Sequence, residues 1–356
     1  MQLPNNNSDN NFPNHYHQNE SNTAHQYDRY YMGKDDSIYN KRFGTNKVIP
    51  REYFVIYNSF KRIYHRLFTL QPKIFTKSIR ILDFGCGNGR LFSSIYRIAK
   101  QYINVSIELI AYDISLVGLK DFIEIIEYEG FILDKGRIDE NKKNILGYWN
   151  KNNLTIQVIH GNSEENLSNI NTLIEKPINL ALSIFTVLGH IPKRQNRQNL
   201  LKDIGKMLSS EGEFIINVST KISLLEESIA YDILRKQYKL FLKYGSIEMA
   251  EKLSAVLKLA TEPGDLYFAK YDQYNFIYTY GHVYSKNELI EDIINADLKI
   301  VDNVKVMSVE QPYIISKNKT KKYLDTLLSL FLSMNLPFGL FKKSDKVLSI
   351  SIAAII

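Results

Sequence analysis

Apolar residues recur along the chain with two alternating periods. Segments 78–84 (SIRILDF) and 106–112 (SIELIAY) are short, apolar and rich in β-branched residues, as buried strands are. Between them, 88–100 (NGRLFSSIYRIAK) places Leu91 and Ile95 at helical spacing. A strand, a turn, a helix and a strand in this order predict a right-handed βαβ unit of a parallel sheet.

The alternation continues towards the C-terminus. The pattern predicts helices over 116–128 and 192–208, and strands over 155–159, 178–185 and 213–218. The strand at 178–185 (INLALSIF) is so apolar that both of its faces must be buried, which is typical of a parallel sheet with helices on both sides.

Later segments complete the pattern. The SSEG sequence at 209–212 predicts a turn, and 221–260 predicts helices too long for a simple crossover. Strands are predicted at 298–307 and 346–356, on either side of another helix. The fold class is therefore α/β, a Rossmann-like doubly wound sheet of seven strands with a helical cap insertion.

The same pattern divides the chain into five parts with different compositions. They are a disordered polar tail (1–27), an N-terminal helical segment covering the active site (28–74), a core (75–220), a helical cap insertion (221–285) and a C-terminal part that completes the sheet (286–356). The first part is rich in Asn, His, Gln and Ser, so it has too few apolar side chains to offset the entropy of ordering.

The amino-acid composition limits the compartment, the metal sites and the partners that can be expected for the protein. Cys86 is the only cysteine, so neither an internal disulfide nor a cysteine-based zinc site can form, and we expect a reducing, cytoplasmic location and no metal. The apolar stretch 323–341 carries Asp325 and Pro337, and 347–356 is too short to span a bilayer, so no transmembrane segment is predicted. A net charge of +7 favours anionic partners, RNA among them.

A glycine-rich turn, ILDFGCGNGR at 81–90, follows the first strand. Three glycines alternate with other residues, and Arg90 stands where a dinucleotide fingerprint needs a third small residue. The turn also lacks the Gly-Lys-Ser/Thr ending of a P-loop. Binding of NAD, FAD or a nucleoside triphosphate at this turn is therefore disfavoured.

The LDFGCGNG part of this turn resembles the first motif of class I S-adenosylmethionine-dependent methyltransferases. The resemblance implies that the loop of Gly85, Cys86, Gly87 and Gly89 binds S-adenosylmethionine, and that Asp83 faces the ammonium group of this cofactor. It also implies that the helix after the loop presents free N–H groups towards the cofactor carboxylate.

The ends of the next three strands extend the resemblance. Asp113 closes the second strand at the position of the family's ribose-binding carboxylate, and Ile114 would lie against the adenine. Asn162 and Ser163 follow the third strand where relatives bind the adenine amino group through an acid. The fourth motif contains Phe185 as a further cofactor-binding candidate.

Candidate residues for the chemistry itself are fewer. His190 follows the fourth strand, where it would act either as a general base towards the acceptor or as a capping or packing residue. His282 and Tyr284 either line the acceptor site or pack in the core. Cys86 has no activating base in the sequence, so a packing role is favoured over a nucleophilic one.

Two segments leave the type of acceptor open. The basic series on helix 192–208 is interpreted as a solvated face, with a nucleic-acid surface as the alternative; its members are Arg194, Arg197, Lys202 and Lys206. The apolar run 323–334 is either a buried helix or a lid over a lipid-like acceptor. An acceptor pocket is expected from 27–68, 221–284 and 309–345.

The functional prediction is an S-adenosylmethionine-dependent methyltransferase with a small-molecule or lipid-like acceptor. A tRNA methyltransferase of the wobble-uridine type is the alternative, because YGHVYSKNELIEDI at 280–293 is faintly similar to the C-terminal region of those enzymes. A second alternative is a cofactor-binding pseudoenzyme that regulates another protein.

Overall fold

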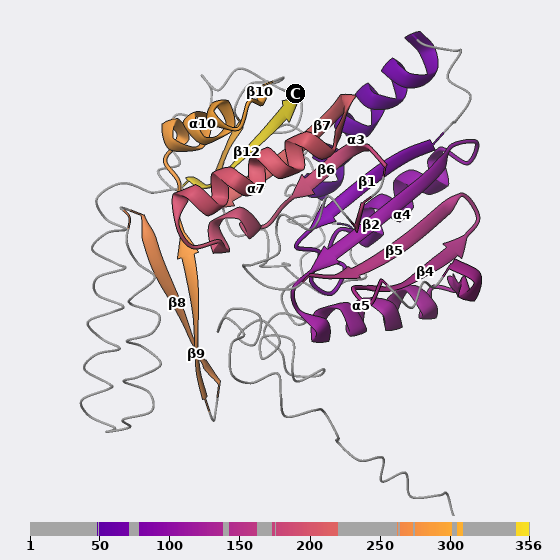
Figure 1. Cartoon of the computed structure of the whole chain (residues 1–356), viewed down its shortest axis with the longest axis horizontal. Helices are drawn as coiled ribbons and strands as arrows, with labels where there is room; N and C mark the ends of the chain where they lie inside the picture. The colour runs from indigo at the N-terminus through magenta and orange to yellow at the C-terminus, as the bar shows by residue number, and fades with distance from the viewer. Residues whose placement is uncertain are drawn as a thin grey trace, which may run out of the picture.

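The structure of the chain is a computed structural model, which describes residues 48, 50–70, 78–137, 142–161, 173–174, 176–219, 262, 264–272, 275–300, 305–308 and 347–355. Within these residues, ten strands form one sheet and two more form a separate hairpin (Figure 1).

Five parallel strands form the centre of the sheet. They are β1 (Ser78–Phe84), β2 (Ser106–Asp113), β5 (Leu154–His160), β6 (Ile178–Ser183) and β7 (Leu208–Ser219). Their order is β7-β6-β1-β2-β5, so the chain reverses its direction of travel across the sheet between β1 and β6. In open α/β sheets, ligands bind beyond the carboxyl ends of the strands at such a switch point.

Antiparallel strands extend both edges of the sheet. β12 (Val347–Ile355) pairs with β7, and β10 (Lys299–Ile300) and β11 (Lys305–Ser308) pair with β12. On the other edge, β4 (Ile145–Lys151) pairs with β5 and with the short β3 (Ile132–Leu133).

Helices cover both faces of the sheet, as the doubly wound prediction requires. One face carries α3 (Pro50–Tyr64), which continues as the π-helix η2 (His65–Leu70), together with α4 (Phe92–Gln101) and α5 (Leu116–Tyr128). The other face carries α7 (Arg194–Met207) and α10 (Lys286–Asn295). Two short 3-10 helices, η3 (Lys135–Arg137) and η5 (Val187–His190), lie in connections.

Alternate residues of the central strands build the two cores. In β1, Ile79 and Ile81 pack with the α3, α4 and α5 side, whereas Leu82 and Phe84 pack with the α7 and α10 side. This alternation is the pleat of a strand buried on both faces, and it explains why the strand sequences are continuous apolar runs.

A buried carboxylate joins α3 to the sheet. Glu213 of β7 is fully buried and accepts from Arg62 Nη2 at 2.6 Å and from Arg66 Nη2 at 2.8 Å. Two guanidinium groups from successive turns of the same helical segment therefore compensate one buried charge, and they fix α3 and η2 against β7.

The predicted Rossmann-like architecture is confirmed, and each of the seven predicted strands has a counterpart. Three details differ. The β3–β4 hairpin adds strands to one edge, and residues 209–212 belong to β7 instead of forming a turn. Residues 265–282 of the predicted helical cap form the antiparallel hairpin of β8 (Asp265–Asp272) and β9 (Asn275–His282), which lies apart from the sheet (Figure 1).

Other predictions fall outside the described residues. They concern the polar tail at 1–27, the helices at 221–260 and the apolar run at 323–334. Among the helices that the structure describes, none is both long and apolar enough to cross a membrane.

Candidate functional site

The glycine-rich turn is tied directly to the end of β2. The N–H groups of Gly85 and Cys86 both donate to the carbonyl oxygen of Tyr112, at 2.8 and 3.1 Å. Gly85 has a φ of 77° and Gly89 a φ of 84°, a backbone region that glycine adopts without strain. A Cβ on Gly89 would lie 2.1 Å from Cδ2 of Phe122, so this glycine also allows helix α5 to pack against the turn.

Asp113 faces the same turn from the end of β2. Its Oδ2 accepts the N–H of Gly87 at 2.6 Å, and its Oδ1 accepts the N–H of Ser115 at 2.8 Å. Ser115 is the N-cap of α5, and its hydroxyl oxygen accepts the N–H of Gly118. The orientation of the Asp113 carboxylate is thus set by one bond to each flanking element.

Three carboxyl groups gather around the turn. Burial, the charge of Asp113 and the charge of Glu52, in that order, raise the pKa of Asp83 to about 8 from the usual 3.8. No ion pair of the described residues involves Asp83. Glu52 belongs to α3, so the N-terminal helical segment contributes a charge to this site. Three acidic groups so close together resist ionising at the same time, so a cationic ligand among them would be stabilised.

Arg90 is the cation of this cluster. Its Nη2 donates to Oε1 of Glu52 at 2.6 Å, and its Nε donates to the same oxygen at 3.0 Å. Its guanidinium carbon lies 4.0 Å from the ring centroid of Phe185. The Arg90 side chain is only 5% exposed, so it joins the turn, α3 and the end of β6 in a largely dry environment.

The backbone after β6 is strained. Phe185 and Thr186 have φ values of 69° and 68°, a left-handed conformation that costs about 1–3 kcal/mol per non-glycine residue. Asn217 holds both residues, because its side-chain oxygen accepts the N–H of Phe185 and its carbonyl oxygen accepts the N–H of Thr186. Such strain is typical of functional loops, and here it keeps the Phe185 ring over Arg90.

N–H groups in the first turn of α4 donate to backbone carbonyl oxygens of the protein. Phe92 donates to the carbonyl oxygen of Gly89 at 3.0 Å, and Ser94 donates to that of Leu91 at 3.0 Å. The expectation that this helix presents free N–H groups to a ligand is therefore wrong for these two residues. The donation follows from the tight turn by which the chain enters the helix.

His190 lies at the end of η5, which is adjacent to the turn because Val187 contacts Gly85. The Nδ1 atom of His190 is 2.9 Å from the carbonyl oxygen of Tyr280, so this nitrogen carries the proton and Nε2 carries the lone pair. Burial lowers the pKa of His190, and the ring is neutral at pH 7.

The remaining candidates for cofactor binding are Cys86, Ile114, Asn162 and Ser163. Burial and the charges of Asp113 and Asp83 raise the pKa of Cys86, so its thiol stays protonated, as a packing residue requires. Ile114 accepts a hydrogen bond from the ring of His160 through its carbonyl oxygen, at 3.1 Å. Asn162 and Ser163 lie outside the described residues.

His282 and Tyr284 pack in the interior. Nδ1 of His282 lies 2.8 Å from Asp265, and its Nε2 lies 2.8 Å from Glu288. Tyr284 is fully buried, with the guanidinium of Arg197 5.4 Å from its ring centroid. Of the two roles considered for this pair, the contacts support packing.

Arg197 was expected on a solvated face, and this is wrong. Its side chain is fully buried, and its Nη2 donates to Glu262 at 2.7 Å. Glu262, Asp265 and His282 have the residue types of a metal site, and their ligand atoms lie within 4.8 Å of one another. These side chains are bound to Arg197, Tyr280 and Glu288, so the group is a structural network at the base of the hairpin.

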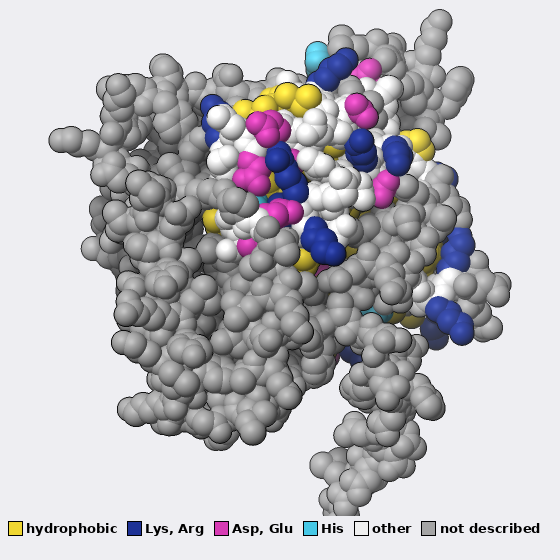
Figure 2. Space-filling view, turned by 60° about the vertical axis from the view of Figure 1, so that its left-hand side comes forward, with side chains coloured by type: hydrophobic (Ala, Val, Ile, Leu, Met, Phe, Trp, Pro, Cys, Tyr) yellow, Lys and Arg dark blue, Asp and Glu magenta, His cyan; other side chains and the backbone are white. Residues whose placement is uncertain are grey.

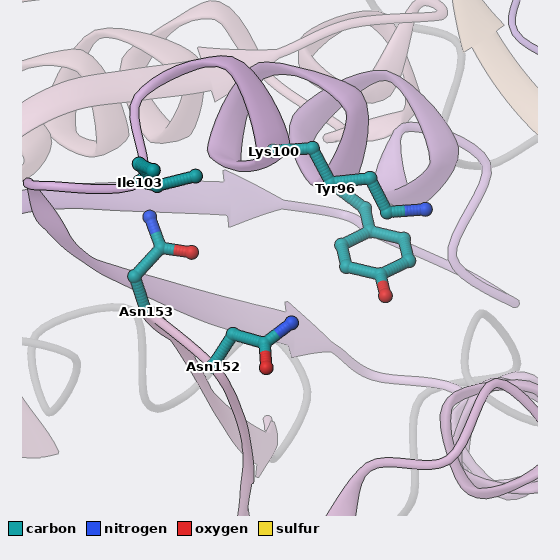
Figure 3. A pocket seen from close by; sticks show the side chains of 5 residues that line it. All are labelled: Tyr96, Lys100, Ile103, Asn152 and Asn153. Carbon is teal, nitrogen blue, oxygen red and sulfur yellow. The ribbon is translucent and has the colours of Figure 1, made fainter.

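A pocket of about 470 Å³ lies elsewhere, where α4 ends and β4 turns into β5 (Figure 3). Its walls are Tyr96, Lys100, Ile103, Asn152 and Asn153. Because β2 and β5 begin beside it, it is at the opposite end of the strands from the glycine-rich turn. It is therefore separate from the carboxylate cluster.

Two residues of the cluster were missed in the sequence. Arg90 immediately follows the third glycine, and this position was a usable signal that was interpreted only as the absence of a dinucleotide fingerprint. Glu52 had no such signal, because it lies 38 residues before its partner, in a helix that shows only an apolar spacing.

Comparisons with known proteins found a family model and similar solved structures. The family model described as a methyltransferase domain matches residues 54–302, more than half of the chain. No curated protein matches the sequence.

Solved structures with a similar arrangement include an S-adenosylmethionine-dependent methyltransferase from Clostridium acetobutylicum, with 13% identity and a TM-score of 0.41 over 85% of this chain and 99% of that one. A methyltransferase from Methanosarcina mazei has 13% identity and a TM-score of 0.43 over 81% and 97%. The CcbJ methyltransferase of Streptomyces caelestis has 9% identity and a TM-score of 0.45 over 94% and 98%.

Proposed function

The chain belongs to the methyltransferase domain family, which confirms the predicted class I, S-adenosylmethionine-dependent type, and we propose that its acceptor is a small or lipid-like molecule. The observation that supports cofactor binding best is the cluster of Asp83, Asp113 and Glu52 around the glycine-rich turn. S-adenosylmethionine carries an ammonium and a sulfonium against one carboxylate, so an anionic site fits it. When bound, it supplies a methyl group that is already activated for transfer.

Different residues of the chain would bind different parts of the cofactor. Asp113, held by the N–H groups of Gly87 and Ser115, is the proposed acceptor for the ribose hydroxyls. Ile114 follows it on the adenine side, and Asp83 provides the charge for the ammonium. Because these groups come from two hydrogen-bonded parallel strands, they hold their geometry before the ligand arrives.

His190 is the proposed general base towards the acceptor. Its neutral ring holds a lone pair on Nε2 because Nδ1 donates to Tyr280. The Tyr280 carbonyl belongs to β9, so the hairpin sets the tautomer of the histidine. A nearby base would remove the proton that an acceptor hydroxyl or amine loses on methylation.

The charges on α7 support a small acceptor over RNA. Arg194 pairs with Asp292 at 2.6 Å, Arg197 is buried against Glu262, and Lys206 pairs with Asp203. Figure 2 shows acidic and basic side chains interspersed over the described part of one face of the molecule. Most of the basic series on this helix is therefore already neutralised, whereas RNA binding needs a basic surface that contacts phosphates.

Transfer of labelled methyl groups from S-adenosylmethionine into separated small-molecule, lipid and RNA fractions tests the acceptor class. We expect label in the small-molecule or lipid fraction, and loss of that label in the Asp113→Ala variant. Label confined to RNA would overturn the acceptor proposal in favour of the tRNA alternative. Binding of the cofactor without label in any fraction would support the pseudoenzyme alternative.

A further inference from the structure

We propose that Glu52 and Arg90 form a binding site for the amino-acid end of S-adenosylmethionine, in which Arg90 receives the carboxylate and Glu52, with Asp83, receives the ammonium. This inference rests on the proposed function, and it adds a residue of the N-terminal helical segment to the cofactor site. The ligand class is an α-amino-acid zwitterion.

The charges of the pair match a zwitterion. Arg90 contacts both carboxylate oxygens of Glu52, at 2.6 Å from Nη2 to Oε1 and at 3.2 Å from Nε to Oε2, and both side chains are largely buried, at 5% and 13% exposure. The α-carbon of an amino acid carries a carboxylate and an ammonium, which can face the Arg90 guanidinium and the Glu52 carboxylate, respectively. With the zwitterion bound beside the Glu52–Arg90 pair, each of these charged groups would have an oppositely charged neighbour.

Glu52 shares its surroundings with Asp83. Its charge acts on the Asp83 carboxyl strongly enough to be one of the three causes that raise the pKa of that group. Two carboxyl groups that repel each other in a buried site gain most from a cation between them. The ammonium of the cofactor is such a cation.

Two N–H groups at the start of α4 are not available to a ligand carboxylate. Phe92 and Ser94 of α4 donate their N–H groups to carbonyl oxygens of the turn, so these two amides are engaged within the protein. Arg90 precedes them and carries a guanidinium, whose fork of donors suits a carboxylate. The ring of Phe185 lies 4.0 Å from the guanidinium carbon and covers one face, which directs further contacts to its edge.

A purely structural role for the Glu52–Arg90 pair is less well supported, because α3 has another anchor. Arg62 and η2 residue Arg66 already bind the buried Glu213 of β7, at 2.6 and 2.8 Å. Arg62 also provides a matched control, because it belongs to the same helix as Glu52 and lies in an ion pair that does not involve the glycine-rich turn.

Calorimetry with three nucleosides tests the proposal on the full-length protein. S-adenosylhomocysteine has the whole amino-acid end, decarboxylated S-adenosylmethionine lacks the carboxylate, and 5′-methylthioadenosine lacks the amino-acid part. For Glu52→Gln and Arg90→Gln we expect S-adenosylhomocysteine affinity to fall about 10- to 100-fold, as for a lost charge-assisted bond, while methylthioadenosine affinity stays within about twofold. For decarboxylated S-adenosylmethionine, Glu52→Gln should weaken binding and Arg90→Gln should not.

A control variant distinguishes a binding role of the Glu52–Arg90 pair from a structural one. Arg62→Gln should lower the melting temperature and leave the ratio of the S-adenosylhomocysteine and methylthioadenosine affinities unchanged. If Glu52→Gln and Arg90→Gln weaken both ligands equally, or neither, the pair is structural and the proposal is overturned. If the wild type binds none of the three nucleosides, the proposed function itself fails, and the proposal fails with it.

Discussion

The carboxyl group of Asp83 is buried beside that of Asp113, and the two residues lie at the carboxyl ends of adjacent parallel strands of the sheet. Burial is the larger effect and the Asp113 charge the next, and together with Glu52 they raise the pKa of Asp83 to about 8. At neutral pH, without a ligand, Asp83 therefore holds a proton that a bound cation would displace.

Cofactor affinity should depend on pH for this reason. Below pH 8 an arriving ammonium must displace the Asp83 proton, so S-adenosylhomocysteine affinity should rise by up to about tenfold per pH unit from pH 6 to 8 and then level off. Calorimetry in buffers of different ionisation enthalpy should show proton release on binding. Methylthioadenosine, which has no ammonium, should show neither effect, and a flat profile for both ligands would contradict the assignment.

The same proton affects stability. The folded pKa of Asp83 lies above its unfolded value of 3.8, so the free energy of unfolding of the ligand-free protein should fall as pH rises from about 4 to 8. The loss amounts to at most about 1.4 kcal/mol per pH unit. Asp83→Asn removes it, so its melting temperature should exceed that of the wild type at pH 8 by more than at pH 5. A variant less stable than the wild type at pH 8 would refute this.

Gly89→Ala should destabilise the fold. The new Cβ would lie 2.1 Å from the Phe122 ring, on a backbone with a φ of 84°. We expect a loss of about 2–4 kcal/mol from overpacking and left-handed strain, measured by denaturant unfolding. Gly136→Ala is the control, because Gly136 is exposed and its Cβ would meet only Asp134, at 3.5 Å. Equal effects of the two substitutions would show that the packing of the turn is unimportant.

His190→Ala should separate turnover from binding. With the acceptor found by label transfer, kcat should fall about 100- to 10,000-fold because the general base is lost. The affinity for S-adenosylhomocysteine should be unchanged, because the residues that bind it are untouched. His65→Ala removes an exposed histidine of η2 and should leave kcat as it is. Retention of kcat in His190→Ala would assign His190 to packing alone.

The sequence predicted those parts of the fold that depend on local patterns. The helix at 116–128 matches α5 residue for residue, and the apolar runs at 78–84 and 178–185 match β1 and β6 within two residues. These elements are predictable because burial in the two cores requires apolar side chains at helical or strand spacing. The glycine-rich turn and Asp113 were singled out through the resemblance to a known family, and no period of the chain marks their roles.

The errors have a common physical cause, which is contact between distant segments. Arg197 was placed on a solvated face because its helix is basic, yet Glu262, 65 residues later, buries it. Ser and Gly at 209–212 favour a turn, but pairing of Leu208 with Ile178 keeps them in β7, with a register shift. The Glu52–Arg90 pair joins residues 38 apart, and no local period records it.

The most direct test of the central claim is calorimetric titration of the wild type and of Asp113→Ala with S-adenosylhomocysteine. Asp113→Asn and Asp203→Asn serve as controls, because the first keeps the shape of the side chain and the second removes an acid of α7, outside the cluster. We predict binding by the wild type and by Asp203→Asn, a loss of at least about 100-fold in Asp113→Ala, and an intermediate affinity in Asp113→Asn. Equal affinities in the wild type and in Asp113→Ala, or no binding by the wild type, would contradict the assignment of this site to the cofactor.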